Sequence, residues 1–277
     1  MEVYYINHKN QKIDLGRPPY QMQVGNVFNF SHKYEGSNFK LKRIYKEITT
    51  ISTTITISSS DDNDFFDALN TFFEVTESDT VSEVQGRLYI GEYYLSCNVI
   101  SSDKSFWKEM FDGVEISVKL LVPYPYWCHE ETKSFLRYNE MIEKSADDFL
   151  SYPFSYPYRY SMPRNSGFIQ NDHYAPCDFQ IIVYGPCTDP SVRIAGHLYE
   201  VITTLYSGEY MVIDSRDNTV TKYKNDGSTE NLYNSRRKDI RVFEKIPSGR
   251  LSVLWNIEAF GFDITLFQER SEPKWSL

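Results

Sequence analysis

The chain has 277 residues, of which 41% are hydrophobic and 24% charged, and this length is sufficient for two domains with apolar cores of their own. Its formal net charge of −9 argues against a nucleic-acid-binding protein, because lysine and arginine must neutralise the phosphates. Aromatic residues make up 16% of the chain and favour strands over a helical bundle, since broad rings pack well on a pleated surface.

Strand patterns dominate the N-terminal part of the chain. A short alternating run at 27–31 is followed by residues 48–58, a β-branched run with the sequence ITTISTTITIS. In this longer run Ile51, Ile55 and Ile57 are expected to face apolar surroundings, with serine and threonine between them. Because so many hydroxyl groups can face water, the run suits an edge strand or a projecting hairpin arm.

One helix is predicted, from residue 61 to about residue 75. Its apolar side chains recur on one face, at Phe65, Leu69, Phe72 and Phe73. The polar residues at 60–62 suit the helix start, because hydroxyl and carboxylate oxygens accept hydrogen bonds from the first N–H groups. Residues 61–64 also look like part of a calcium loop. The glycine and distal glutamate of an EF-hand are out of register, so capping is the preferred interpretation.

The middle of the chain carries a predicted β-hairpin. Residues 86–90 and 93–97 alternate in polarity and are separated by Gly91 and Glu92, which indicates a two-residue turn of type II′. Residues 105–111 are predicted to form a short helical turn that ends near Gly113. A strong strand is expected at 114–122.

Residues 129–165 differ in character from the strands on either side. Apolar side chains at roughly helical spacing predict a helix over 129–149. Alternating prolines and aromatic residues follow at 152–160, a pattern that excludes a helix and disfavours a central strand. We expect these rings to cover a seam between two domains, although exposed tyrosines such as Tyr156 and Tyr158 could also bind a sugar or a partner protein.

Strand signals then recur at a spacing of about ten residues. They fall at 179–184, 197–205, 210–214, 219–224, 240–243, 251–256 and 260–268. Short strands with regular turn signals predict an antiparallel β-sandwich. The fold class is therefore mainly β with minor α, comprising a β-rich N-terminal domain at 1–130, a linker or insertion at 131–165 and a C-terminal sandwich at 166–277.

No catalytic, cofactor or metal motif stands out in the sequence. The five histidines are isolated from one another, and neither HExxH nor a cysteine–histidine cluster with zinc spacing occurs. The run His129-Glu130-Glu131 could offer metal ligands, but solvated residues are the favoured interpretation. Glycine-rich phosphate loops and the GxSxG elbow are absent. We therefore predict no catalytic residue, no cofactor and no metal.

The cysteines are expected to be free thiols. Cys97, Cys128, Cys177 and Cys187 are spread without a CxxC motif. The first residues do not form a signal segment, and no apolar run approaches 18 residues, so a protein made in a reducing cytoplasm is the simplest interpretation. A disulfide between Cys177 and Cys187 is the less favoured alternative.

The C-terminal third carries motifs in a specific order and spacing. Their residues are Gly208, Glu209, Asp214, Gly227, Asn231, Pro247, Gly249, Trp255, Arg270, Pro273 and Trp275. In this order and spacing the chain resembles the distal tail protein family of siphophages. Each of these residues also suits a structural role: the glycines allow positive φ in turns, and the tryptophans are large enough to close a sandwich core.

This resemblance implies a phage-tail hub. Members of the family form a homohexameric ring through the N-terminal domain, and a galectin- or carbohydrate-module-like sandwich lies outside the ring. The ring joins the tail-tube protein to the tail-associated or tail-tip protein and often anchors receptor-binding proteins. The resemblance thus implies a virion component of the tail tip that is assembled in the host cytoplasm, is not an enzyme and binds neither nucleic acid nor membrane directly. A hexamer would carry a charge on the order of −50, which suits a lumen through which DNA slides.

Two other functions and one assembly hypothesis remain open at this stage. The sandwich and the aromatic residues at 152–160 could make the chain a glycan-binding adaptor, and a paired-carboxylate hydrolase is a more distant alternative. The run at 48–58 could pair strands between subunits of a ring, because an unpaired edge is a template for another strand. In that case Ile55→Lys should prevent ring formation.

Overall fold

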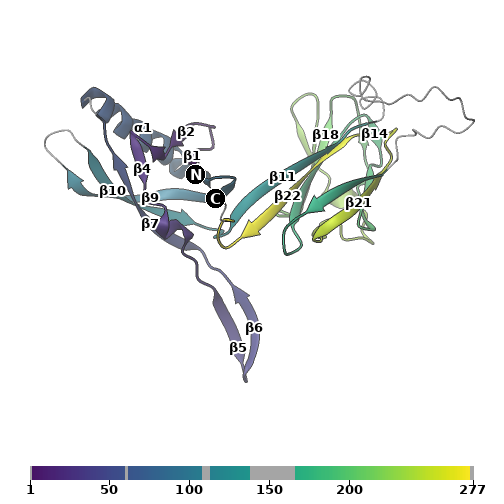
Figure 1. Cartoon of the computed structure of the whole chain (residues 1–277). Coiled ribbons are helices and arrows are strands. Elements are labelled where there is room, and N and C mark those ends of the chain that lie inside the picture. Colours follow the sequence, from purple (N-terminus) through teal and green to yellow (C-terminus); the bar gives the residue numbers. More distant parts are fainter. Residues whose placement is uncertain (1, 60–61, 108–112, 138–165, 275–277) are drawn as a thin grey trace, which may run out of the picture. The chain divides into compact units, whose positions relative to one another are not determined.

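The structure is a computed structural model that describes residues 2–59, 62–107, 113–137 and 166–274 (Figure 1). Contacts divide the chain into two compact units: unit 1 comprises residues 1–129 and 269–277, and unit 2 comprises residues 130–268. The chain leaves unit 1 within strand β11 and returns to it within strand β22. The division differs from the predicted domain ranges in placing residues 269–277 with the N-terminal unit, and in placing residues 131–137, predicted to begin a separate linker or insertion, with the C-terminal unit.

Unit 1 is a curled antiparallel sheet with a helix against it. Its elements are β1 (Val3–Ile6), β2 (Lys12–Asp14), β3 (Gly16–Arg17), β4 (Tyr20–Met22), the 3-10 helix η1 (Gly25–Phe28), β5 (Lys33–Ser37), β6 (Lys40–Tyr45), β7 (Thr49–Ile57), α1 (Asp62–Val81), β8 (Gly86–Ile90), β9 (Tyr93–Trp107), β10 (Val114–Val122) and the first residues of β11 (Trp127–Phe135). The strands pair in the order β2-β1-β8-β9-β10-β7-β4-β3, while β5 pairs with β6. Strand β9 pairs with β8 through its first residues and with β10 through the rest, which lets the sheet curl.

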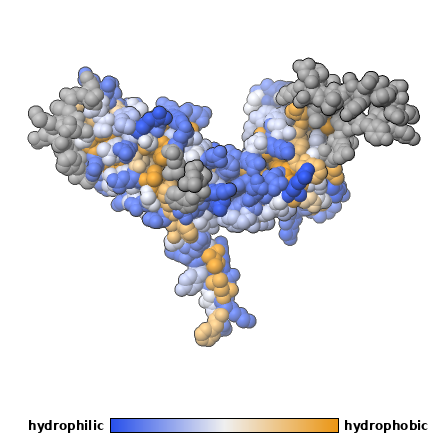
Figure 2. Space-filling view, in the orientation of Figure 1, coloured by the Kyte–Doolittle hydropathy of each residue, from blue (hydrophilic) through white to orange (hydrophobic). Residues whose placement is uncertain are grey.

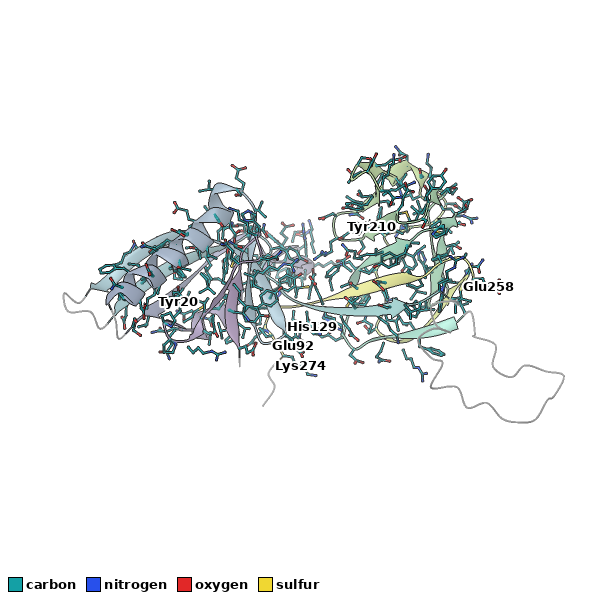
Figure 3. The ribbon with its side chains drawn as sticks, turned by 90° about the horizontal axis from the view of Figure 1, so that it is seen from above. Tyr20, Glu92, His129, Tyr210, Glu258 and Lys274 are labelled. Atoms are coloured by element: carbon teal, nitrogen blue, oxygen red, sulfur yellow. The ribbon has the colours of Figure 1, made fainter. Side chains whose placement is uncertain are left out.

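Helix α1 covers the apolar face of this sheet, and its predicted stripe is confirmed. Phe65 and Phe72 are buried in the core, and Leu69 and Phe73 pack against it half-buried. The hydroxyl of Tyr20, on β4, donates to the carbonyl of Ala68 at 2.8 Å (Figure 3). The helix continues six residues beyond the predicted end.

The extra turns of α1 are polar, which is why the apolar pattern did not predict them. The buried hydroxyl of Thr76 donates a hydrogen bond to the carbonyl of Phe72 at 2.8 Å. Asp79 is fully buried and accepts hydrogen bonds from the hydroxyl of Tyr5 in β1 and from the backbone N–H of His8 in the loop after β1. A buried polar network, rather than apolar burial, therefore holds the last turns of the helix.

The hairpin of β8 and β9 is confirmed, including its turn. Ile90 pairs with Tyr93, so the loop has two residues, and Gly91 has a φ of 60° while Glu92 stays outside the positive-φ region. This combination is that of a type II′ turn. Two other local predictions are wrong: residues 105–107 belong to β9, with 108–111 outside the described residues, and residues 27–31 begin in η1 instead of forming a strand.

Unit 2 is an antiparallel sandwich, as predicted. Its elements are the remainder of β11, β12 (Ser166–Asn171), β13 (Asp178–Tyr184), β14 (Cys187–Thr188), β15 (Ser191–Ile194), β16 (His197–Glu200), β17 (Thr204–Leu205), β18 (Tyr210–Asp214), β19 (Thr219–Tyr223), β20 (Thr229–Asn231), the 3-10 helix η2 (Tyr233–Ser235), β21 (Gly249–Trp255) and β22 (Phe262–Arg270). One layer has the order β20-β19-β18-β13-β22-β11, the other has the order β12-β21-β15-β16, and β14 pairs with β17.

Large rings from both layers meet in the core of unit 2. Phe135 of β11 stacks on Phe262 of β22 with ring centroids 4.7 Å apart, and Trp255 of β21 meets Phe135 edge-on at 5.2 Å. Phe179 of β13 and Tyr199 of β16 make a similar edge contact at 5.0 Å. Trp255, which is expected to close a sandwich core, is 7% exposed within this cluster.

Three predictions for this half of the chain need correction. Residues 129–135 lie in β11, not in a helix, because Phe135 serves as a core ring between the layers; residues 138–149 are outside the described part. Residues 240–243 form turns that bury Val242 without strand pairing. The predicted strand at 197–205 is interrupted, and its two ends pair in different sheets as β16 and β17.

All four cysteines are free thiols, as predicted. Cys97, Cys128 and Cys177 are buried, and Cys187 is half-buried. Burial raises the pKa of Cys97 to about 12 and that of Cys187 to about 11. These two thiols therefore remain protonated and unreactive at neutral pH.

A buried ion pair joins the turn before β18 to strand β19 in unit 2. Glu209 Oε2 lies 2.7 Å from Lys222 Nζ, and both side chains are less than a tenth exposed. The carboxylate also accepts a hydrogen bond from the backbone N–H of Tyr206 at 2.8 Å. The hydrogen bond from Lys222, followed by that from Tyr206, holds the pKa of Glu209 below its usual value.

Glu209→Gln is expected to lower the free energy of unfolding at pH 7, since it leaves Lys222 without its counter-charge. A carboxyl whose pKa is lowered by folding stabilises the fold above its unfolded pKa, and this contribution is lost as the pH falls through the folded pKa. The difference from wild type should therefore shrink in acid. Urea unfolding at pH 7 and in the acid range measures it.

The matched control is Glu230→Gln, which removes the carboxylate of the exposed pair between Lys224 and Glu230. An exposed pair is worth little, so this variant should stay close to wild type. Equal effects of the two substitutions, or a Glu209→Gln effect that does not change with pH, would contradict the account.

Candidate functional site

A projecting hairpin is the most exposed feature of unit 1. Strands β5 and β6 pair only with each other, and they extend away from the body of the unit (Figure 1). Almost every residue between Lys33 and Tyr45 is exposed. We call residues 33–45 the arm. An isolated two-stranded hairpin is marginally stable in water, so the arm has few contacts of its own to hold it in place.

The arm has one apolar face. Tyr34 pairs with Ile44 across the strands, and a bulge after Glu35 lets Gly36 pair with Leu41, which brings Leu41 to the same face. These three side chains are 77%, 58% and 62% exposed in the order Tyr34, Ile44 and Leu41. Figure 2 shows hydrophobic residues along the arm. A contiguous apolar face of this kind on a narrow hairpin marks an interaction surface.

The tip of the arm places a phenylalanine where a glycine would be easier to accommodate. Asn38 and Phe39 form the two-residue turn and have φ values of 52° and 60°. Positive φ at both positions is the type I′ geometry, which favours asparagine first and glycine second. Phe39 is fully exposed, so its ring stabilises nothing within unit 1. An unfavourable backbone conformation retained for an exposed ring points to a contact outside the unit.

The arm is basic although the chain is acidic. Residues 33–45 contain four basic side chains and one acid, a formal charge of +3, whereas the whole chain carries −9. The rest of the chain therefore carries −12. Electrostatic complementarity favours an acidic partner surface for the arm.

A groove with a volume of about 610 Å³ lies at the base of the arm. Its lining combines residues beside the arm, the start of β7 and the start of β11. One rim is Thr49–Ser52 of β7, which pairs with β10 on one side and with no described strand on the other. The groove thus presents an open strand edge, the kind of edge to which another strand can be added.

Lys46 forms part of the groove wall. Its Nζ donates to the carbonyl of Pro125 at 2.8 Å and lies 4.3 Å from the ring centroid of Tyr126 and 5.2 Å from that of Phe30. Burial lowers the pKa of Lys46 to about 8. Further burial of Lys46 by a partner would favour its neutral form.

The predicted assembly role of residues 48–58 needs correction. Strand β7 pairs with β10 along its whole length and with β4 at Ile55–Ile57, so its second half is interior. Ile55 is 2% exposed, and Ile55→Lys would place a charge in the core instead of testing an interface. The projecting hairpin is the neighbouring arm, and the open edge is confined to Thr49–Ser52.

The predicted motif residues lie mostly in unit 2. Gly208, Gly227 and Gly249 have φ values of 83°, 81° and 103°, so each occupies a conformation that suits glycine. The turn at Gly208 packs against Asn225, whose side chain would lie 2.5 Å from an added Cβ. The structure thus brings two of the motif turns together, near the Glu209–Lys222 pair.

The other motif residues are spread over both units. Asp214 accepts a hydrogen bond from Gln180 at 3.1 Å, Asn231 Oδ1 accepts one from the backbone N–H of Tyr233 at 2.8 Å, and the carbonyl of Pro247 accepts from Asn171 at 3.0 Å. Arg270 and the buried Pro273 belong to unit 1, and Trp275 lies outside the described residues. These residues do not converge on one site.

Sequence reasoning missed the arm, although one signal was available. The residues on either side of Asn38 and Phe39 alternate around a two-residue turn, but the strand rule looks for a buried face, and the arm has none within its own unit. Within the described ranges, no group of three or more His, Cys, Asp or Glu side chains is placed to hold a metal ion. Nor does any described helix have the length and apolarity needed to span a membrane.

Comparison with solved structures gives matches over nearly the whole chain. The Dit protein gp 19.1 of phage SPP1, described as a hub of the adsorption apparatus in phages that infect Gram-positive hosts, has a TM-score of 0.58 and 6% identity, covering 97% of this chain and 99% of its own. A chain of the phage P2 baseplate, activated with Ca, has a TM-score of 0.59 and 11% identity with 98% and 99% coverage. The same baseplate with Sr gives 0.57 and 12%.

Comparison at the level of sequence finds nothing similar. No protein-family model and no curated protein matches the chain. At identities of 6% to 12% the structural matches show the fold alone. The chain therefore has the fold of these phage hub and baseplate proteins in both units, which confirms the fold predicted from the family resemblance.

Proposed function

We propose that the chain is the structural hub of a phage tail tip, six copies of which form a ring through unit 1. The exposed arm carries this proposal. Its apolar face and its Phe39 are exposed in the unit that bears them, and of its four basic side chains Lys33 is paired within the unit, with Glu47. A second copy of the chain, which carries −12 outside its own arm, offers a partner of opposite charge and the open strand edge of β7.

In this proposal the arm of one copy lies against unit 1 of the next copy. Each copy then contributes one arm and one groove, so the contact is head to tail and can close into a ring. In a closed ring the apolar face of every arm is buried. The number six comes from the resemblance to the distal tail proteins.

The ring is proposed to join the tail-tube protein on one side to the tail-tip protein on the other, with receptor-binding proteins at its rim. The fold shared with the SPP1 hub protein and the P2 baseplate supports this place in the virion tail. The role is structural and needs no catalytic group. The net charge of −9 per copy suits a lumen that repels DNA.

Native mass spectrometry of the purified chain over a range of concentrations tests the proposal. We expect a six-copy species that grows at the expense of the monomer, since a closed ring leaves no free arm or groove. A monomer at all concentrations, or an open series of sizes without a preferred one, would refute the ring.

A further inference from the structure

Unit 2 contains a cavity of about 290 Å³ that the proposed hub does not use. It lies between the end of β11, the Gly185–Pro186 turn and the start of β22. This is near the lower limit of small-molecule pockets and is sufficient for one six-membered ring with its substituents. All of its described lining residues belong to unit 2.

The base of the cavity is formed by buried aromatic residues and is fixed. Phe135 and Phe260 are 6% and 3% exposed, and Phe135 is held by its stack on Phe262. The backbone is equally constrained at Gly261, where an added Cβ would lie 3.0 Å from both the nitrogen of Arg137 and the carbonyl oxygen of Phe135. The cavity is therefore preformed, and a ligand would not need to order it.

Three polar side chains complete the lining. The hydroxyl of Tyr184 donates to Asp263 Oδ2 at 2.7 Å. Burial and this hydrogen bond raise the pKa of Tyr184 to about 12, so the hydroxyl keeps its proton and fixes the carboxylate. Arg137 Nε donates to the carbonyl of Glu258 at 2.9 Å, in the turn before β22 (Figure 3).

Asp263 and Arg137 each use one side-chain atom in these hydrogen bonds, and their other polar atoms are available to a ligand. Asp263 Oδ1 and the two terminal nitrogens of Arg137 have no hydrogen-bond partner among the described residues. The site therefore offers a carboxylate acceptor and guanidinium donors beside apolar walls. Its paired charges disfavour an anion, which Asp263 would repel, and a cation, which Arg137 would repel.

A neutral polyhydroxylated ring satisfies all of these groups. Its hydroxyls can donate to Asp263 and accept from Arg137 at the same time, while its C–H face packs on Pro186 and on the ring of Tyr184, which is 43% exposed. We propose that this cavity is a binding site for a neutral saccharide, occupied by one sugar residue. The inference goes beyond the hub function and does not depend on it, because every residue involved lies in unit 2.

A row of tyrosines leads away from the cavity. Tyr184 pairs with Tyr210 across β13 and β18, and Tyr210 pairs with Tyr223 across β18 and β19. The rings of Tyr210 and Tyr223 stack at 4.7 Å, and Tyr210 lies at the surface (Figure 3). Neighbouring strands are about 4.8 Å apart, so the row extends roughly 10 Å and offers hydroxyls to further sugars of a longer glycan.

Saturation-transfer NMR and calorimetry on the full chain test the proposal. The probes are glucose, galactose, mannose and N-acetylglucosamine, with glucuronate and glucosamine as charged counterparts. We expect saturable binding of at least one neutral sugar, weaker binding of its charged counterpart, and a loss of about tenfold or more in affinity for Asp263→Ala and for Arg137→Ala. Asp217→Ala and Arg241→Ala remove the same charges from exposed positions of unit 2 and should bind like wild type.

Three results would overturn the saccharide site. The first is that no neutral probe binds at concentrations up to about 50 mM, which lies well above the dissociation constants typical of small ligands. The second is that the cavity variants and the control variants bind equally well. The third is that a charged probe binds more tightly than its neutral counterpart. For the tyrosine row, Tyr210→Ala should weaken a tetrasaccharide of the bound sugar and spare the monosaccharide; equal binding of the tetrasaccharide would exclude the row. Absence of sugar binding would not bear on the proposed ring, and absence of a ring would not bear on the proposed sugar site.

Discussion

Replacing Tyr34 and Ile44 together by serine is expected to abolish self-assembly while both units remain folded. The two side chains face each other across the arm and are 77% and 58% exposed, so their loss costs unit 1 little. Buried at an interface, two such anchors are worth about 3 kcal/mol together, which weakens each contact on the order of 100-fold. Sedimentation velocity on wild type and variant measures the change.

The adjacent rung of the arm supplies a matched control. Glu35 pairs with Arg43, and Glu35→Ser with Arg43→Ser changes two exposed side chains on the opposite face without altering the net charge. This double variant should assemble nearly as well as wild type. If both double variants assembled alike, the apolar face of the arm would not be the contact surface.

The tip of the arm allows function to be separated from folding. Phe39→Gly places the favoured residue at the second position of the type I′ turn, so the hairpin should be at least as stable as before. The same change removes the exposed ring. A variant that folds at least as well but assembles less well would show that Phe39 is retained for a partner, whereas unchanged assembly would remove it from the interface.

Asp79→Ala is expected to destabilise unit 1 by about 3 kcal/mol, the cost typical of removing one partner from a buried polar network. The carboxylate is fully buried and accepts the hydroxyl of Tyr5 at 2.5 Å, the backbone N–H of His8 at 2.8 Å and the His8 ring at 2.5 Å. Its removal leaves these groups unpaired between β1 and the end of α1. Chemical denaturation measures the free energy of unfolding.

Two further variants bracket this result. Asp67→Ala removes an exposed carboxylate from the same helix and should stay near wild type. Gly86→Ala blocks the network sterically, since an added Cβ would lie 2.0 Å from the Tyr5 hydroxyl and 2.2 Å from Asp79 Oδ2, so it should destabilise as well. An Asp79→Ala protein as stable as Asp67→Ala would show that the network is not what holds β1 to α1.

The sequence allowed the parts of the fold with a buried face to be predicted. The stripe from Phe65 to Phe73, the hairpin at Gly91 and strands such as β10 all bury alternate or periodic side chains, so their patterns are legible. Helix α1 was predicted too short because Thr76 and Asp79 are buried through hydrogen bonds, which no hydropathy pattern reveals. Phe135 was assigned to a helix because apolar residues follow it in the sequence at roughly helical spacing, whereas it lies in strand β11.

The functional surfaces were harder to predict than the fold. The arm buries nothing in its own unit, so its apolar residues look like loop residues until a bulge is seen to align Leu41 with Tyr34. The cavity in unit 2 joins Arg137, Tyr184 and Asp263, which are far apart in sequence and meet only through sheet pairing. The motif residues that carried the family resemblance, such as Gly249 and Trp255, lie in turns and in the core and form no part of the arm or of this cavity.

Electron microscopy of the purified wild-type chain tests most directly whether copies of unit 1 close into a ring. If arm and groove belong to successive copies, class averages will show an annulus with six-fold symmetry and an open centre, and the Tyr34→Ser, Ile44→Ser protein will show single particles. Wild-type images with only single particles, or an annulus that persists unchanged in the double variant, would contradict assembly through the arm.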